Sequence, residues 1–101
     1  MISAGHFRVE VDHPCLPGHF PSRPVVPGVV LLDEALALML VGAPGLRVAG
    51  LAAARFLRPV LPGEEVEVLH EAVEPGRVGF TCRVAGRDAV RGAALLACNE
   101  A

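Results

Sequence analysis

Hydrophobic and polar residues follow a strand-like pattern through the second half of the chain. Two stretches alternate, a third is mostly apolar, and the short turn sequences EPGR and AGRD separate them: EEVEVLHEAV, VGFTCRV and AVRGAALLAC. Alternation with a period of two is typical of strands that bury one face. Short turns join strands that are antiparallel neighbours. The pattern therefore predicts three strands in an antiparallel meander.

The first half combines one alternating stretch with one apolar stretch. Polar and apolar residues alternate from His6 to Val11, which predicts a first strand. Residues 29–41 are almost wholly apolar and end at GAPG, which predicts a helix. That helix is apolar on every side and shorter than the ~20 residues a membrane span needs, so we expect it to be buried in protein. In the following segment, residues 46–60, we expect a strand in the later part.

Together these elements predict one α+β domain that covers residues 1–101. It has one strand, a buried helix and about four more strands, with the sheet wrapped around the helix. A chain of 101 residues with 52% hydrophobic residues can form one core of this kind.

Composition narrows the classes of partner and the compartment. The net charge is -2 and there is no basic run, which argues against nucleic acid or an anionic membrane as partner. All nine positive charges are scattered arginines, which we interpret as solvated surface, although arginine clusters also pair with carboxylate or phosphate. The three cysteines have no paired spacing and are expected to be free. No leader-like segment or membrane span is found, so we expect a cytoplasmic protein.

One segment stands apart from both patterns, because it contains five prolines and two glycines in seventeen residues: DHPCLPGHFPSRPVVPG. Such a composition excludes helix and ladder and predicts a loop. Prolines surround His19, and a loop restrained in this way can hold one side chain in place at a low entropic cost. This makes His19 a candidate general base.

Two acids, Asp33 and Glu34, interrupt the apolar helix. Neighbouring positions on a helix differ by ~100°, so one acid can face a pocket while the other turns away. A carboxyl group desolvated there is expected to keep its proton near neutral pH and to act as a general acid. The unpaired N–H of Gly28 or Val29 could bind a carbonyl oxygen. With His19, these groups suit abstraction of a proton beside a carbonyl, together with departure of hydroxide as water.

The same residues carry a family resemblance. GHFPSRPVVPGVVLLDEA closely resembles the active-site segment of the 3-hydroxyacyl-acyl carrier protein dehydratases, and RFLRPVLPGEEVEV resembles the strand that follows in that family. The two blocks cover about half of the chain. The resemblance implies the hot-dog fold, a curved antiparallel sheet of about five strands around one central helix.

The resemblance also implies roles for single residues. His19 matches the histidine that removes the C2 proton of a 3-hydroxyacyl thioester, and Asp33 matches the acid that assists departure of the 3-hydroxyl. Gly28 matches the glycine whose N–H holds the thioester carbonyl, and Glu34 falls where the family usually has alanine. Neighbouring residues are expected to contact the substrate: Phe20, Pro27 and Val29.

Two positions depart from the family pattern. Ser22 stands at a usual glycine, and Ala37 stands where many members have a glutamine that helps to fix the acid.

For the whole protein the resemblance implies a dehydratase of 3-hydroxyacyl chains on acyl carrier protein, with no cofactor and no metal. It also implies a homodimer or higher homo-oligomer whose sites are shared between subunits. Two alternatives use the same fold. One is an acyl thioesterase or acyl-CoA hydratase, and the other is a non-catalytic partner subunit, which the presence of both His19 and Asp33 disfavours.

Overall fold

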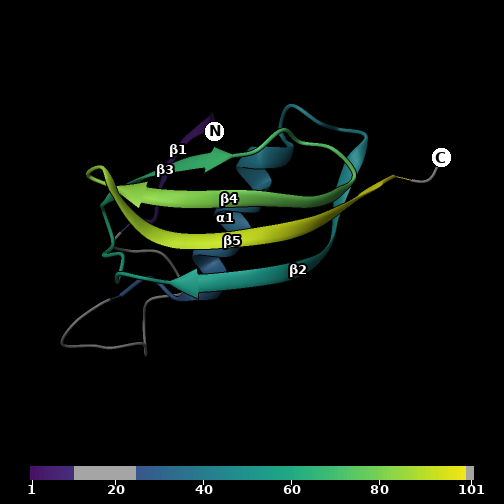
Figure 1. Cartoon of the computed structure of the whole chain (residues 1–101). Coiled ribbons are helices and arrows are strands. Elements are labelled where there is room, and N and C mark those ends of the chain that lie inside the picture. Colours follow the sequence, from purple (N-terminus) through teal and green to yellow (C-terminus); the bar gives the residue numbers. More distant parts are fainter. Residues whose placement is uncertain (11–24, 100–101) are drawn as a thin grey trace.

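The computed structural model describes residues 1–10 and 25–99. It has one helix and one five-stranded antiparallel sheet with the strand order β1-β3-β4-β5-β2 (Figure 1). In chain order the elements are β1 (Ile2–Arg8), α1 (Gly28–Leu40), β2 (Leu46–Phe56), β3 (Glu65–His70), β4 (Gly76–Val84) and β5 (Arg87–Cys98).

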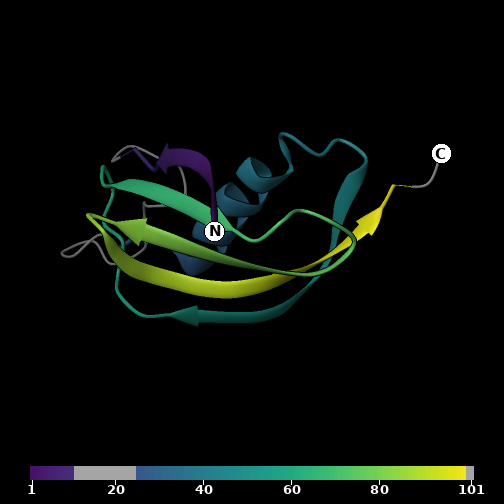
Figure 2. The same ribbon diagram turned by 45° about the horizontal axis from the view of Figure 1, so that its top comes forward.

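The sheet bends around one side of α1. Figure 2 shows the long strands curving beneath the helix, with β1 at one edge and β2 at the other. This arrangement confirms the predicted α+β hot-dog architecture. It also confirms the meander, since β3, β4 and β5 are consecutive neighbours in the sheet.

The core lies between the concave face of the sheet and one face of the helix. Leu31, Ala35 and Met39 recur every four residues on α1, and all three are buried. They belong to the same hydrophobic cluster as nine residues of the sheet: Val66, Val68, Val78, Phe80, Cys82, Ala89, Val90, Ala94 and Leu96. The helix is not covered on every side, however, because Val29 is 64% exposed in the single chain and Asp33 and Glu34 are also exposed.

The β4–β5 hairpin turns at the predicted position. Val84 pairs with Arg87, so Ala85 and Gly86 form a two-residue loop. Both residues have positive φ, 52° and 78°, as a type I′ turn requires. The turn places Arg87 and the following residues of β5 beside the end of β4.

Two predicted boundaries were wrong. The first strand occupies Ile2–Arg8 instead of residues 6–11, because its pairing with β3 already begins at Ile2. In the segment 46–60 the strand is the earlier part, Leu46–Phe56. This strand lies at an edge and buries neither face, so hydrophobic alternation gave no signal for it.

Candidate active site

The N-terminus of α1 has no side-chain cap. Pro27 occupies the N-cap position, and its carbonyl accepts hydrogen bonds from the N–H groups of Val30 and Leu31 at 3.0 and 3.3 Å. Within the part of the chain that the structure describes, the N–H groups of Gly28 and Val29 donate no hydrogen bond. Helix geometry leaves these first N–H groups without intrahelical partners. No described residue thus competes with an oxygen atom of a ligand for these two N–H groups.

An apolar hollow of about 370 Å³ opens beside this helix end. The segment before the helix, the end of β2 and the chain that follows β2 form its walls. A backbone hydrogen bond of 2.8 Å from Val26 N–H to the Val60 carbonyl ties two of these segments together. The hollow is lined by Val25, Val26, Gly28, Leu31, Phe56, Leu57, Arg58, Pro59 and Val60. Among the described residues, Arg58 is the one charged residue that lines it, so this part of the wall suits an acyl chain better than a polar ligand.

Gly28 packs closely against an aromatic side chain of β2. A Cβ atom built at this position would lie 2.7 Å from Cζ and 2.8 Å from Cε1 of the Phe56 ring. A glycine therefore allows the aromatic ring of β2 to lie directly against the first turn of α1. The ring itself is half exposed, at 51% for the residue, so it forms a wall of the hollow that can move.

The two acids of the helix both lie outside this hollow. Asp33 and Glu34 are exposed in the single chain, and neither lines the apolar walls. We expected apolar neighbours to exclude water from one of these carboxyl groups, and in the single chain they do not. The reason is geometric: the buried stripe through Leu31 and Ala35 leaves positions 33 and 34 on the outer side of the helix. The catalytic role of Asp33 stays a prediction.

The remaining site residues predicted from the sequence divide into two groups. Gly28 lines the hollow, Pro27 is the half-buried N-cap, and Val29 is exposed. His19 and Phe20, with Ser22, lie outside the described residues. Whether His19 and Asp33 meet in one site therefore stays a prediction, as do the expected absences of metal and cofactor.

The structure describes two other histidines, one at the surface and one in the core. His6 is exposed, and its Nε2 lies 3.8 Å from Glu67 Oε2. His70 is buried, with its Nδ1 2.6 Å from the carbonyl oxygen of Glu71. It is thus a packed residue of β3 and does not face solvent.

Of the cysteines, Cys82 and Cys98 are free, as expected. Burial raises the pKa of the Cys82 thiol to about 11, which removes it as a nucleophile at neutral pH. Cys98 is exposed near the end of β5. Cys15 lies outside the described residues.

Sequence reasoning gave no site role to the segment 56–59, although it supplies much of the wall. The signal was present, because RFLRPV lies within the second block that resembles the dehydratases. No helix of the described chain has both the length and the apolarity to cross a membrane.

Comparison with known proteins gives related enzymes and the same fold. Residues 3–93 match the ApeI-like family, described as ApeI dehydratase. The chain is 37% identical over 94 residues to the 3-hydroxyacyl-(acyl-carrier-protein) dehydratase FabZ of Actinobacillus succinogenes, covering 84% of this chain and 61% of that one. It is 40% identical over 80 residues to the FabZ of Haemophilus influenzae, covering 69% of this chain and 53% of that one.

Solved structures agree at the level of the fold. The dehydratase heterocomplex ApeI:P from Xenorhabdus doucetiae has a chain with a TM-score of 0.79 and 23% identity, over 93% of this chain and 84% of that chain. A thioesterase from Thermus thermophilus, complexed with coenzyme A and Zn, gives a TM-score of 0.62 and 23% identity, over 97% and 80% of the two chains. The chain spans little more than half the length of the curated relatives it matches. The match to the family description runs through nine tenths of this chain, and the chain therefore belongs to the ApeI-like dehydratase family.

Proposed function

We propose that this protein dehydrates 3-hydroxyacyl thioesters carried by acyl carrier protein, giving 2-enoyl thioesters in fatty-acid or polyene synthesis. The observation that carries the proposal is the uncapped N-terminus of α1 beside an apolar hollow, in a chain of a dehydratase family. Both features serve one substrate, since an acyl thioester has a carbonyl oxygen beside a hydrocarbon chain.

In this mechanism the backbone holds the thioester. The Gly28 N–H donates a hydrogen bond to the carbonyl oxygen, while the apolar walls receive the acyl chain. Removal of a proton from C2 places negative charge on that oxygen, and a fixed N–H dipole in an apolar site stabilises this charge. The bare glycine lets the oxygen approach the helix beside the ring of Phe56.

The side chains exchange protons with the substrate. His19 takes the proton from C2, the electron pair forms the C2–C3 double bond, and the C3–O bond breaks. Asp33 gives its proton to the departing hydroxyl, which leaves as water. The proton on His19 can then return to Asp33 through solvent, which restores both groups.

A shared site in a homodimer or higher homo-oligomer reconciles this role with the exposure of Asp33. The edge strand β2 is exposed on both faces, and Val48, Leu51 and Phe56 are 36%, 43% and 51% exposed. Pairing of two β2 strands around a two-fold axis would cover this edge. It would also let a second chain cover the outer side of α1, where Asp33 lies, and supply the opposing His19.

The first test is the substitution His19→Ala, with His6→Ala as the control. His6 is exposed and lies on the far edge of the sheet, whereas the buried His70 is unsuitable because truncation would disturb packing. Loss of the general base should lower the dehydration rate by ~10²–10⁴, and the control should retain the wild-type rate. Enoyl product and free thiol are measured separately, so release of thiol without enoyl product would identify a thioesterase instead.

The shared site is tested by complementation. His19→Ala and Asp33→Asn chains, each inactive, are unfolded together and refolded as a mixture. In a mixed two-fold dimer one site has both intact residues, so about a quarter of all sites should recover if mixing is random. No activity in a mixture that mass spectrometry shows to contain heterodimers would place both residues in one chain.

The free thiols of Cys82 and Cys98 suit the reducing cytoplasm, which is the compartment proposed here.

A further inference from the structure

The connection between β2 and β3 contains a tight turn, residues 61–64. The Glu64 N–H donates a hydrogen bond of 3.2 Å to the Leu61 carbonyl, which leaves Pro62 and Gly63 as the central residues. Gly63 has a φ of 87°, and proline followed by a left-handed glycine is typical of a type II turn. The side chain of Glu64 closes the turn a second time, because the Leu61 N–H donates to its Oε1 at 2.7 Å.

The turn and the residue before it hold two segments that are far apart in the sequence. The Gly63 N–H donates to the Val9 carbonyl at 2.7 Å, and the Val60 carbonyl accepts from the Val26 N–H at 2.8 Å. Val9 follows β1 and Val26 precedes α1, so the chain that contains His19 connects them. Both ends of that chain are therefore fixed to one short piece of backbone between β2 and β3.

These two anchors lie in the core. Val9, Val26 and Val60 are 4%, 2% and 2% exposed, and all three belong to the hydrophobic cluster that includes the buried face of α1. A buried backbone group that loses its hydrogen bond is left without a partner at a high cost in free energy, so such bonds are rarely broken. The anchors therefore fix where the chain that contains His19 begins and where it ends.

One of the anchors also sets the start of α1. Val26 is followed by Pro27, the N-cap residue, and by Gly28, the first residue of the helix. In the proposed mechanism the Gly28 N–H holds the thioester carbonyl while His19 removes a proton from the neighbouring C2. Such a step needs the reacting atoms ~3–3.5 Å apart, so the base and the N–H group have to be held in place relative to each other. A single turn that anchors the chain on both sides of His19 can do this.

We infer that the turn 61–64 positions His19 relative to the Gly28 N–H, and that Glu64 is the side chain that keeps the turn in shape. The inference rests on the proposed function for the roles of His19 and Gly28. Glu64 is not among the described residues that line the apolar hollow, so it acts through the backbone as a positioning residue. A carboxylate suits this task, because it accepts a stronger hydrogen bond than a neutral oxygen does.

The first test compares Glu64→Ala with Glu65→Ala in the dehydration assay. Without the carboxylate the turn should relax and His19 should shift, which should lower kcat about tenfold. KM should change by less than about twofold, because the apolar walls that bind the acyl chain remain. Glu65→Ala should keep the wild-type values, since Glu65 is exposed and its one polar side-chain contact among the described residues is the 3.7 Å ion pair with Arg8.

The conservative variant Glu64→Gln shows whether the hydrogen bond is the cause. Glutamine keeps an oxygen that can accept the Leu61 N–H, so this variant should retain most of the wild-type kcat. A wild-type kcat in Glu64→Ala would overturn the inference. An equal loss of kcat in Glu64→Gln and Glu64→Ala would also overturn it, because the hydrogen bond to Leu61 would then not be what positions His19.

Gly63→Ala disturbs the same turn independently of Glu64. Its matched control is Gly86→Ala in the β4–β5 turn, because the two glycines have φ values of 87° and 78° and an alanine is strained at both. Both variants should therefore lose a similar amount of stability, measured as the urea midpoint of unfolding. Only Gly63→Ala should also lower kcat. Equal kcat values in the two variants at similar midpoints would contradict a positioning role for the turn.

The position of His19 can also be followed without turnover. NMR spectra of protein with isotope-labelled histidine rings are recorded, and the His19 signals are assigned from their absence in His19→Ala. These signals should shift in Glu64→Ala and stay unchanged in Glu65→Ala. Amide hydrogen exchange at Val26 should also become faster in Glu64→Ala.

These measurements separate the inference from the proposed function. Shifted His19 signals in Glu64→Ala, when the wild type dehydrates no thioester, would leave the anchoring of His19 standing and remove the dehydratase. Unchanged His19 signals and an unchanged kcat in Glu64→Ala, with normal dehydration by the wild type, would overturn the positioning role alone. A circular dichroism spectrum checks that each variant is folded. If Glu64→Ala does not fold, the comparison of Gly63→Ala with Gly86→Ala decides between the two outcomes.

Discussion

The two edge strands of the sheet, β1 and β2, differ in how they protect their free edges. β1 has seven residues and a bulge between Ser3 and Gly5. Two of its polar side chains approach acids of β3: Arg8 forms an ion pair with Glu65 at 3.7 Å, and His6 Nε2 lies 3.8 Å from Glu67 Oε2. Short length, a bulge and charge are features that discourage pairing with another chain.

β2 is longer than β1 and has no charged residue along its middle. It has eleven residues, and its charged residues, Arg47 and Arg55, lie near its ends. Two bulges bend it against β5, yet apolar residues such as Val48 and Leu51 remain exposed. A long apolar edge of this kind needs a cover. The difference fits the proposed homo-oligomer, in which a second copy of the chain would cover β2.

The largest expected effect comes from a charge placed in the middle of the open edge. Leu51→Asp should convert the proposed dimer into monomers, because an uncompensated carboxylate would be buried where two β2 strands meet. Activity should fall with it, since the shared sites would come apart. Light scattering after size-exclusion chromatography measures the mass, and the enoyl assay measures the activity.

Ile2→Asp on β1 is the matched control. Ile2 is 54% exposed and Leu51 is 43% exposed, so neither substitution should disturb the core of the single chain. The control should keep the wild-type mass and rate. A Leu51→Asp protein with the mass of a dimer would show that β2 is not the assembly edge.

The next effect concerns the attachment of β2 to the rest of the sheet. A Cβ at Gly92 on β5 would lie 2.7 Å from the Ala53 carbonyl oxygen and 2.7 Å from Cζ of Phe80. Gly92→Ala should therefore lower the free energy of unfolding by ~1–3 kcal/mol, as overpacking does. Gly42→Ala is the control, because nothing lies within 4 Å of that position. Equal urea midpoints for the two variants would contradict the close packing of β2 on β5.

Much of the fold could be predicted from the sequence, because buried side chains recur at regular intervals along a helix or strand. The helix and the meander were recognised with boundaries within three residues, since α1, β3 and β4 each bury a regular set of side chains. The same reasoning failed for β2, where nothing is buried to produce a pattern. Hydrophobic periodicity reports contacts within the chain, and β2 makes its contacts with β5 through the backbone.

The site was less predictable than the fold. Gly28 was identified from its place in the motif, but the Phe56 ring that packs against it comes from a distant strand. The arginines were interpreted as solvated surface because their spacing along the chain shows no cluster. Only the register between β2 and β5 brings Arg55 opposite Arg91. Such proximity depends on tertiary structure, so no local pattern in the sequence indicates it.

A third, smaller effect is expected where the end of β2 forms the site. In Gly28→Ala the new methyl group displaces the Phe56 ring, which is free to swing because it is half exposed. Stability should change by less than about 1 kcal/mol, since an alanine also favours the helix. The displaced ring should narrow the apolar hollow and lower kcat/KM about tenfold, or ~1.4 kcal/mol.

The double variant Gly28→Ala, Phe56→Leu separates this cause from others. A smaller side chain leaves room for the methyl group, so kcat/KM should recover in part. If Gly28→Ala alone keeps the wild-type kcat/KM, the packing of β2 on the helix start does not shape the site.

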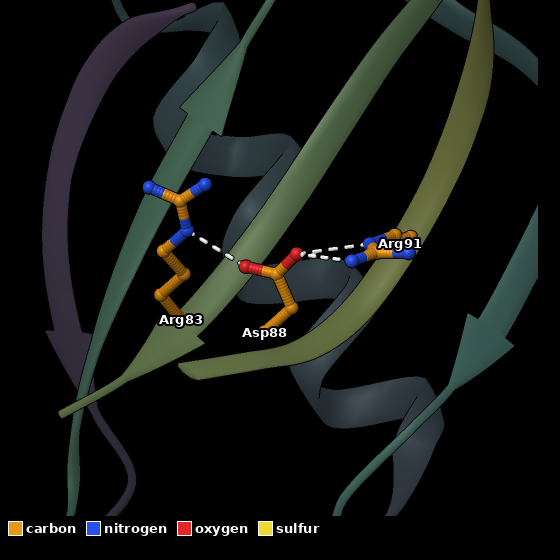
Figure 3. A network of polar contacts seen from close by, with 3 residues as sticks. All are labelled: Arg83, Asp88 and Arg91. Atoms are coloured by element: carbon orange, nitrogen blue, oxygen red, sulfur yellow. Dashed lines mark hydrogen bonds and ion pairs between the residues drawn. The ribbon is translucent and has the colours of Figure 1, made fainter. Parts of the chain in front are cut away.

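The smallest expected effect comes from the ion pairs, because those on the β2 side of the sheet contribute more to stability than those on the β1 side. Asp88 accepts hydrogen bonds from Arg83 and Arg91, and these hold the pKa of its carboxyl below the usual 3.8. A lowered pKa in the folded state means that the unfolded chain binds the proton more readily. The hydrogen bonds from Arg83 and Arg91 (Figure 3) therefore stabilise the fold fully when the pH is above the usual pKa. This contribution is lost as the pH falls through the lowered pKa.

Asp88→Asn should accordingly cost up to ~1 kcal/mol at pH 7, as for a well-formed surface network, and the cost should shrink below about pH 4. Glu65→Gln on the β1 side is the control. Its pair with Arg8 is longer, at 3.7 Å, and both side chains are at least half exposed, so its removal should cost close to nothing at any pH. Urea unfolding of the three proteins between pH 3 and pH 7, a range of about four units around the usual carboxyl pKa, measures both differences. A cost for Asp88→Asn that does not vary with pH would mean that the substitution acts through packing and that the charge of Asp88 contributes nothing to stability.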